Sequence, residues 1–360
     1  MALSTQGPKR SSIRQFQQSL LILLRQCLAS IRKYASFLKR PATQATAKAT
    51  AASTAAPSTV RARAGIRARM PNGSWDSHVH VFDPVRYPLP PGSLYTPPPS
   101  STDDLVAFEA TLGLSRVVLV QPSCYGNDNT CMLEALQKLG PRRARAVITF
   151  DPATTTATQL SAFHALGVRG VRINLQSVGK TLDAGSLRAT LQQYADAVRP
   201  LGWVVQVYVS LPLVKLLEDI VPDLDVRVCI DHIGHPDLAP TAAASAAYRA
   251  SRDPYDLEGF ASLIALLKAG STYTKISGAY RFSQRPADYE DGRPMVQEIL
   301  RVAGKHRAVF ASDWPHTRFD NLDITTWTEK VMDWCEDEAT LNAVFRDTAV
   351  DLWDVEGDDE

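Results

Sequence analysis

The stretch WDSHVHVFDP, residues 75–84, decides the fold class. Its apolar and β-branched residues predict a strand, and His78 and His80 lie two positions apart, so their side chains share one face of it. In a barrel strand that face can be the interior, where paired imidazoles bind a divalent cation or polarise a carbonyl oxygen without one. Taken alone, such a pair is more often two core histidines bonded to backbone carbonyls. The residues expected to point outward are Ser77, Val79 and Val81.

Similar strand patterns recur downstream, where short apolar, β-branched runs alternate with longer segments of helical periodicity. Several runs are apolar on both faces, as expected of parallel strands buried on both sides. Eight alternations predict a (β/α)8 TIM barrel, with a doubly wound open sheet as the alternative. No glycine-rich phosphate loop follows any predicted strand, which disfavours a dinucleotide-binding sheet. The predicted strands are 75–83, 116–123, 144–151, 168–176, 203–210, 225–234, 272–280 and 308–316.

Helices are expected between these strands, and two connections are long. The segments 84–100, with seven prolines, and 235–256 both follow the carboxyl ends of strands, where barrel active sites lie. Loops of this length are usually lids or binding loops. The predicted helices are 102–113, 130–139, 186–198, 211–220, 257–269 and 295–303, with closing helices over 325–353.

The charge of the chain is uneven along its 360 residues. Thirteen of the 39 basic residues fall in residues 1–70, which contain no Asp or Glu, so the remaining chain carries 26 basic and 38 acidic residues. An acidic body gives no reason to expect nucleic-acid binding. Five widely spaced cysteines have neither disulfide-framework nor zinc-site spacing, and no apolar run is long enough to span a membrane.

The basic leader, residues 1–70, has a composition of its own. An amphipathic pattern from Leu20 to Leu38 is followed by an Ala/Thr/Ser-rich stretch that cannot build a core. An amphipathic, Arg-rich, acid-free leader is typical of a mitochondrial transit peptide. A membrane-surface helix or a mispredicted gene start remains as an alternative. The predicted location is therefore mitochondrial, with the cytoplasm as the alternative.

The histidines gather at strand ends. Five of the seven lie in a predicted strand or just beyond its carboxyl end, among them His232 near the end of strand six. Asp313 lies near the end of strand eight, and a buried carboxylate beside histidines can act as a general base on water. Taken alone, Asp313 could equally cap a helix or form a rim salt bridge. The combination of His78, His80, His232 and Asp313 on strands one, six and eight is stronger than any one of them.

These residues lie in motifs that resemble the amidohydrolase-related branch of the amidohydrolase superfamily, and within it the 2-pyrone-4,6-dicarboxylate lactonase-like group. The motifs are WDSHVHVFDP at 75–84, IDHIG at 230–234, SDWPH at 312–316, YTPP at 95–98, VQPS at 120–123, YGNDN at 125–129 and GVRGVRIN at 167–174. The resemblance implies a catalytic (β/α)8 domain over 74–355 and hydrolysis of a lactone, ester or amide carbonyl.

The resemblance also implies roles for individual residues. His78, His80 and His232 would hold the electrophilic carbonyl oxygen, and Asp313 would activate water. The positions that match substrate contacts are Tyr95, Ser123, Arg172, Tyr208 and Arg281. One departure concerns the second arginine that the dicarboxylate lactonases carry after strand four, because this chain offers only Lys180 there. A substrate with one carboxylate, or with hydroxyls, is therefore equally open.

The sequence predicts the metal content of the site less directly than its residues. No lysine ends strand four to bridge two metals, so we expect one ion or none. A zinc coordination sphere could be filled by His78, His80, His232 and Asp313. The resemblance to the lactonase-like group instead implies catalysis without a cofactor. We expect a small carboxylate or lactone substrate. A lactone isomerase or a decarboxylase on the same scaffold is the competing enzyme, and a non-catalytic barrel would be expected to lack part of the His/Asp set.

Overall fold

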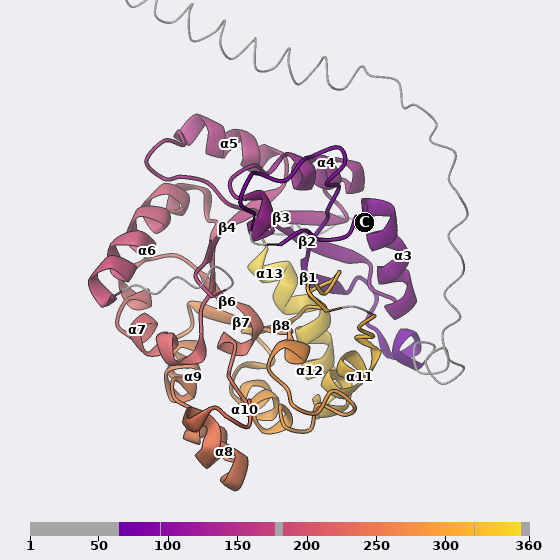
Figure 1. Cartoon of the computed structure of the whole chain (residues 1–360), viewed down its shortest axis with the longest axis vertical. Helices are drawn as coiled ribbons and strands as arrows, with labels where there is room; N and C mark the ends of the chain where they lie inside the picture. Colours follow the sequence, from indigo (N-terminus) through magenta and orange to yellow (C-terminus); the bar gives the residue numbers. More distant parts are fainter. Residues whose placement is uncertain (1–64, 94, 177–182, 320, 354–360) are drawn as a thin grey trace, which may run out of the picture. The chain divides into compact units, whose positions relative to one another are not determined.

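The computed structural model describes residues 65–93, 95–176, 183–319 and 321–353. Eight parallel strands form one sheet in which each strand pairs with the next along the chain. Val79 on the first strand bridges Trp314, just after the eighth, and this contact brings the two edges together. Helices surround the strands in Figure 1, as expected for a TIM barrel. The predicted fold class is confirmed.

The strands begin where the sequence predicts but end earlier. Six of the eight start at the predicted residue, whereas the carboxyl ends of all eight are shorter by two to six residues. The missing residues form the turns that carry the candidate site. The strands are β1 (Trp75–Val79), β2 (Arg116–Val120), β3 (Ala144–Ile148), β4 (Val168–Asn174), β5 (Val204–Tyr208), β6 (Val228–Ile230), β7 (Thr272–Ile276) and β8 (Ala308–Phe310).

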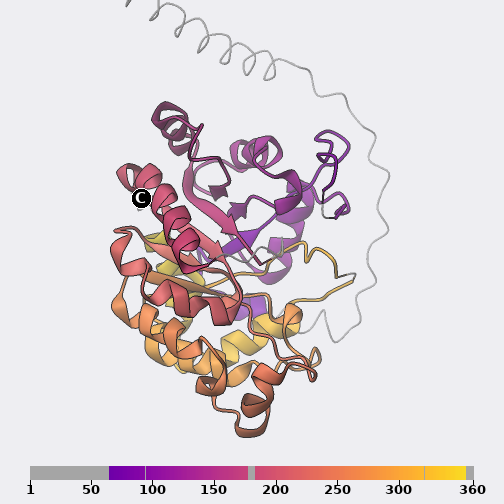
Figure 2. The ribbon, with the colours of Figure 1, turned by 60° about the vertical axis from the view of Figure 1, so that its left-hand side comes forward.

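The six predicted helices are present, and α5, which follows β3, and the short α8 are additional. The helix α8 lies outside the ring of helices in both views (Figures 1 and 2). The α-helices are α3 (Thr102–Leu112), α4 (Thr130–Leu139), α5 (Ala157–Ala165), α6 (Ala184–Val198), α7 (Val214–Glu218), α8 (Ala246–Ser251), α9 (Phe260–Ala269), α10 (Arg293–Ala303), α11 (Thr325–Trp334), α12 (Glu338–Asn342) and α13 (Thr348–Leu352).

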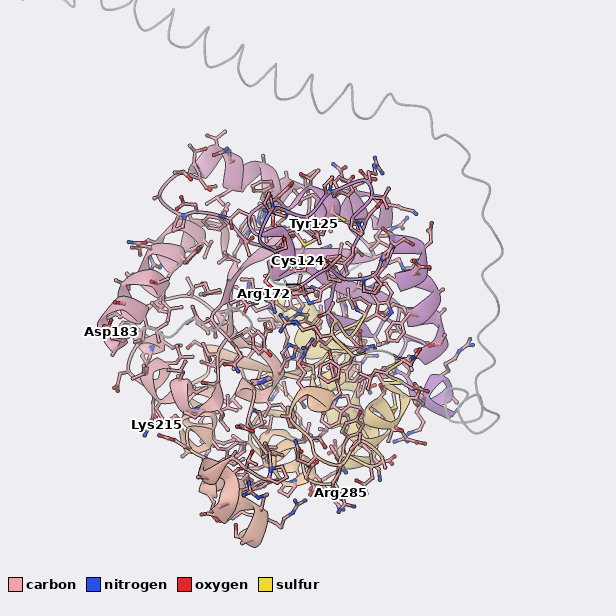
Figure 3. The ribbon with its side chains drawn as sticks, viewed as in Figure 1. Cys124, Tyr125, Arg172, Asp183, Lys215 and Arg285 are labelled. Carbon is pink, nitrogen blue, oxygen red and sulfur yellow. The ribbon has the colours of Figure 1, made fainter. Side chains whose placement is uncertain are left out.

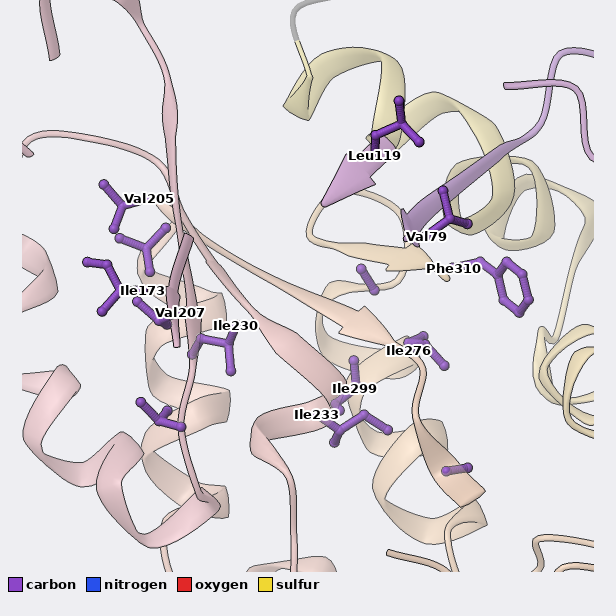
Figure 4. Packing of buried hydrophobic residues seen from close by; sticks show 14 of the residues in the cluster. Val79, Leu119, Ile173, Val205, Val207, Ile230, Ile233, Ile276, Ile299 and Phe310 are labelled. Atoms are coloured by element: carbon purple, nitrogen blue, oxygen red, sulfur yellow. The ribbon is translucent and has the colours of Figure 1, made fainter. Parts of the chain in front are cut away.

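The two faces of the strands build two hydrophobic cores. The outer core lies between strands and helices, and Figure 4 shows part of it, including Val205 and Phe310. The inner core fills the barrel axis with residues such as Trp75 and Val204, and Trp353, at the end of α13, completes it. Tyr273, the second residue of β7, donates a hydrogen bond to Asp351 of α13 at 2.9 Å, so this helix closes the amino end of the barrel.

A β-bulge in β1 changes one prediction. The register of β1 against β2 shifts between Asp76 and Val79, and such a bulge adds one residue to the strand. Ser77 therefore faces inward and its Oγ accepts a hydrogen bond from Trp353 at 3.3 Å, so the prediction that it points outward is wrong. Val79 belongs to the outer core as predicted, and both His78 and His80 face inward.

The described part of the chain begins inside the predicted leader. Residues 65–69 are helical, and Ile66 and Met70 are buried in the outer core. The packed body thus includes residues before the predicted limit at 74, while the amphipathic pattern from Leu20 to Leu38 lies outside the described residues. No helix among the described residues is long and apolar enough to cross a membrane.

Candidate active site

A polar pocket of about 320 Å³ opens at the carboxyl ends of the strands. Of the nine residues predicted for the site, only His78 is absent from its lining, because it lies one layer deeper. Figure 3 shows Arg172 near the centre of the ring of helices. The predicted residues that line the pocket are His80, Tyr95, Ser123, Arg172, Tyr208, His232, Arg281 and Asp313.

The two histidines of β1 belong to one chain of hydrogen bonds. His80 Nδ1 lies 2.7 Å from the Val120 carbonyl, which can only accept, so this nitrogen carries a proton. His80 Nε2 is then an acceptor and lies 3.2 Å from His78 Nε2, which must donate. His78 Nδ1 is left to accept from Lys275 Nζ at 3.2 Å. The order of the donors fixes both neutral imidazoles in one tautomer each.

Lys275, on β7, is the centre of a buried polar layer under the pocket. Its Nζ lies 2.7 Å from Gln206 Oε1 and 3.3 Å from Asp231 Oδ1, and the ammonium is 5.3 Å from the Trp353 ring centroid. The sequence prediction included neither Lys275 nor Asp231. A lysine in a strand that is otherwise buried on both faces was the signal that could have revealed this layer.

Asp313 lies on the pocket wall with one oxygen bonded and one unpaired. Its Oδ2 accepts from the Tyr280 hydroxyl at 2.7 Å and from Arg281 Nε at 2.8 Å. Its Oδ1 is buried without a hydrogen bond among the described residues, 3.5 Å from His80 Nε2. Burial acts to raise the pKa of Asp313, but the positive charge of Arg281 outweighs it and holds that pKa well below its usual range. Asp313 is therefore ionised at neutral pH.

His232 is placed by a turn with left-handed backbone. It follows β6 at φ 53°, and the next residue, Ile233, has φ 59°, which is strained for a β-branched side chain. Strain of this kind concentrates at functional sites. Ser277 Oγ lies 2.7 Å from His232 Nδ1, and His232 Nε2 points toward Asp313 Oδ2 at 3.6 Å. Gly278 lies directly against the ring, where a Cβ would come within 2.8 Å of His232 Cγ.

The histidines of the site are uncharged. Burial is the main cause that lowers the pKa of His78 and His80, and it lowers the pKa of His232 to about 3 and that of His235 to about 4. Neutral imidazoles can donate or accept single hydrogen bonds without bringing a positive charge. The positive charge at the pocket therefore comes from arginines.

The opposite wall holds the predicted substrate contacts. Arg172 on β4 donates to the Gln121 carbonyl at 3.1 Å, and its Nε lies 3.6 Å from Asp231 Oδ2. Tyr208 lies beside it, with the guanidinium carbon 5.7 Å from the ring centroid, and its hydroxyl is 2.9 Å from His235 Nδ1. Arg281 is already paired with Asp313, so Arg172 is the arginine of the predicted set that is better placed to bind a substrate anion.

Three residues of the predicted set bring possible metal-ligand atoms close together. Ligand atoms of His78, His232 and Asp313 lie within 4.8 Å of one another. A histidine that binds a metal normally donates its second ring N–H to an acceptor. The partner of His78 Nδ1 with hydrogen-bond geometry is Lys275, a donor, although Asp231 Oδ1 also lies 3.3 Å away. This hydrogen-bonding pattern does not fit a metal on His78 Nε2.

The model of the amidohydrolase family (Amidohydro_2) matches residues 75–355. The chain belongs to the amidohydrolase family. Its curated relatives include the 2-pyrone-4,6-dicarboxylate hydrolase of Comamonas testosteroni, 31% identical over 69% of this chain and 78% of the relative. They also include the 4-sulfomuconolactone hydrolase of Hydrogenophaga intermedia, 29% identical over 71% of this chain and 78% of the relative. The chain is accordingly an enzyme of the hydrolase class.

Other relatives bear on the alternatives. The D-galactarolactone isomerase of Agrobacterium fabrum is 27% identical over 75% of this chain and 87% of the relative. Among solved structures, a probable 2-pyrone-4,6-dicarboxylic acid hydrolase of Acinetobacter baumannii has a TM-score of 0.66 at 24% identity, over 78% of this chain and 99% of that one. A zinc-bound amidohydrolase of Burkholderia multivorans has a TM-score of 0.57 at 23% identity, over 79% and 99%. At these identities the two structures support the fold alone.

Proposed function

We propose that this enzyme opens the ring of a small, carboxylate-bearing lactone by hydrolysis, with Asp313 as the general base. The observation that carries the proposal is the ionised Asp313 beside neutral His80 and His232 in a pocket that also holds Arg172. Lactone hydrolases among the curated relatives support the same reaction class.

Substrate binding begins at Arg172. A carboxylate matches the planar fork of a guanidinium, and Arg172 is held in place by Gln121 and Tyr208. The hydroxyls of Tyr95, Ser123 and Tyr208 line the same space and can orient ring substituents. The lactone carbonyl then lies against His80 and His232, on the side of Asp313.

In the chemical step, Asp313 Oδ1 takes a proton from water as the water oxygen bonds to the carbonyl carbon. The carbonyl electron pair moves onto its oxygen, which His232 Nε2–H can stabilise when Ser277 donates to Nδ1. One well-aimed donor of this kind contributes about 3–4 kcal/mol to the transition state. Collapse of the tetrahedral intermediate breaks the ring C–O bond, and the proton on Asp313 passes to the ring oxygen to give a hydroxy acid or its tautomer.

His78 and Lys275 support this chemistry from below, and they favour a site without metal. Since His78 Nε2–H donates to His80, neither Nε2 of the pair offers a free lone pair to an ion. His78 is therefore a positioning residue that orients His80. A divalent cation such as Zn²⁺ remains the alternative cofactor.

The test is a panel of lactones and carboxylate esters, assayed with added Zn²⁺, with a chelator and with neither, in ¹⁸O-labelled water. We expect one oxygen-18 atom in the product carboxylate and rates that neither Zn²⁺ nor the chelator changes. A product without label would favour the isomerase alternative, for which one relative provides a precedent. A rate that needs the metal would contradict the metal-free site.

We further propose that the basic leader, residues 1–70, directs the protein to mitochondria, on the basis of its thirteen basic and no acidic residues. Fusing this segment to a fluorescent protein tests the proposal. Import with cleavage supports it, and diffuse cytoplasmic fluorescence contradicts it.

A further inference from the structure

A second pocket adjoins the active site, and the proposed reaction does not use it. Its volume is about 410 Å³, compared with about 320 Å³ for the pocket that contains Asp313. The two pockets share Gln176, His235 and Arg281 as lining residues, so they meet along one common wall. A volume above about 300 Å³ is in the range of small-molecule sites. We call this second space the side pocket.

The side pocket lies between the loops that follow three neighbouring strands. Because β5, β6 and β7 are adjacent in the sheet, the loops at their carboxyl ends lie next to one another. Their apolar side chains form much of its wall, whereas Phe319 is the one aliphatic or phenyl side chain in the described lining of the catalytic pocket. The apolar lining of the side pocket consists of Leu211, Pro212, Pro236, Ala239, Leu257 and Phe282.

The charges on this wall disfavour an anion. Arg281 is the one cation in the described lining of the side pocket, and it is already paired with Asp313 at 2.8 Å. Of the two carboxylates in the lining, Glu258 is paired with Lys215 at 3.1 Å, so Asp237 contributes a net negative charge. Asp237 is exposed, and water and salt screen its attraction for a cation. The wall therefore favours an uncharged group.

His235 forms the boundary between the two pockets. It is one of the histidines at the strand ends, and the proposed reaction gives it no role. Its backbone has a left-handed φ of 48°, and its Nδ1 lies 2.9 Å from the hydroxyl of Tyr208, which lines the catalytic pocket. Strain of this kind concentrates at functional sites. Burial lowers the pKa of His235 to about 4, so an uncharged ring stands where the pockets meet.

We propose that the side pocket binds an uncharged alkyl or aryl substituent of the lactone, so that the enzyme prefers a substituted lactone to the bare ring. The proposal rests on the proposed lactonase function. The lactone carboxylate stays at Arg172, and the substituent extends past His235 to the apolar side chains of the three loops. Its burial supplies binding energy that a substrate of one small ring does not have.

The test is a series of lactones that share one carboxylate-bearing ring and differ in the length of a linear alkyl substituent. Each buried methylene should lower KM about three- to fourfold. The kcat should change less than about threefold, because contacts far from the reacting atoms stabilise the ground state and the transition state alike. A substituent of the same length that ends in a carboxylate or an ammonium should lose this gain.

Ala239→Phe fills the side pocket, because Ala239 is half-buried in the loop after β6. This variant should lose the dependence of KM on substituent length. The matched control is Ala287→Phe, which adds the same ring at an exposed position outside the lining of both pockets and should keep the dependence. The wild-type series needs no variant: a KM that did not change with length, or that was lowest for a charged substituent, would overturn the proposal. An unchanged dependence in Ala239→Phe would also overturn it.

Calorimetry with butanoate and octanoate separates the side pocket from the lactonase function. Both offer a carboxylate to Arg172, and only the longer chain reaches the side pocket. Octanoate should bind the wild type at least about tenfold more tightly than butanoate, and Ala239→Phe should bind the two alike. If this result is obtained but no lactone is hydrolysed, the side pocket stands and the lactonase proposal fails. If lactones are hydrolysed and the wild type binds both acids alike, the side-pocket proposal fails alone.

Discussion

Substitution of Gly278 by alanine should damage the site through His232. Gly278 has φ 67°, and a Cβ there would come within 2.8 Å of His232 Cγ, so the ring must retreat by roughly 0.6 Å to reach an ordinary contact of 3.4 Å. A misplacement of about 1 Å in a catalytic group can cost about a hundredfold in rate. We therefore expect kcat/KM to fall by about ten- to a hundredfold in Gly278→Ala, and the left-handed backbone to cost about 1–2 kcal/mol in stability.

The control is Gly202→Ala. Gly202 has almost the same φ, 65°, but no atom lies within 4 Å of the position of an added Cβ. It should lose the same free energy of unfolding in urea and keep its activity. If both variants retained wild-type kcat/KM, His232 would not take part in the rate-determining step; if both lost it equally, backbone strain rather than displacement of the ring would be the cause.

Two further predictions concern metal affinity and pH. Lys275→Gln gives His78 Nδ1 an acceptor and frees its Nε2, so the Kd for Zn²⁺ in calorimetry should fall about tenfold or more; unchanged affinity would contradict the tautomer assignment. Burial lowers the pKa of His232 to about 3 and that of His235 to about 4, so the unfolded chain binds protons below pH 6.5 that the folded chain excludes. The free energy of unfolding should therefore fall as the pH is lowered from 6.5 to 4, by up to about 1.4 kcal/mol per pH unit for each histidine. Asp76 acts in the opposite direction, because its pKa is raised to about 6 and the folded chain binds that proton first, but it is a single group. Urea unfolding at pH 7.5 and 5 that showed no loss would contradict this.

The order and number of strands could be predicted because apolar runs and turn residues are local signals. The carboxyl ends of the strands could not be predicted, since His232 and Asp313, two and three residues beyond the observed strand ends, adopt left-handed φ values of 53° and 63° that their residue types do not predict. These conformations are stabilised by the surrounding structure, such as the contact of Gly278 with the His232 ring, and no residue pattern within the strand predicts them.

Part of the candidate site could likewise be predicted from the sequence and part could not. His78, His80, His232 and Asp313 could be found because spacing and motif group them. Lys275, like Asp231, is a single polar residue within or beside an apolar strand, and its meaning depends on neighbours almost 200 positions away, such as His78. The side pocket was missed for a similar reason: only the fold brings its three loops together.

The role of Asp313 is tested most directly by kcat for Asp313→Asn on a lactone that the wild type hydrolyses, with the Kd of a carboxylate inhibitor measured in parallel. The amide is close in shape to the carboxylate but cannot accept a proton from water. Loss of general-base catalysis should lower kcat by about 10²–10⁴-fold, while inhibitor binding at Arg172 stays within a few-fold of the wild type. A variant that turned over at the wild-type rate would contradict the assignment of Asp313 as the base.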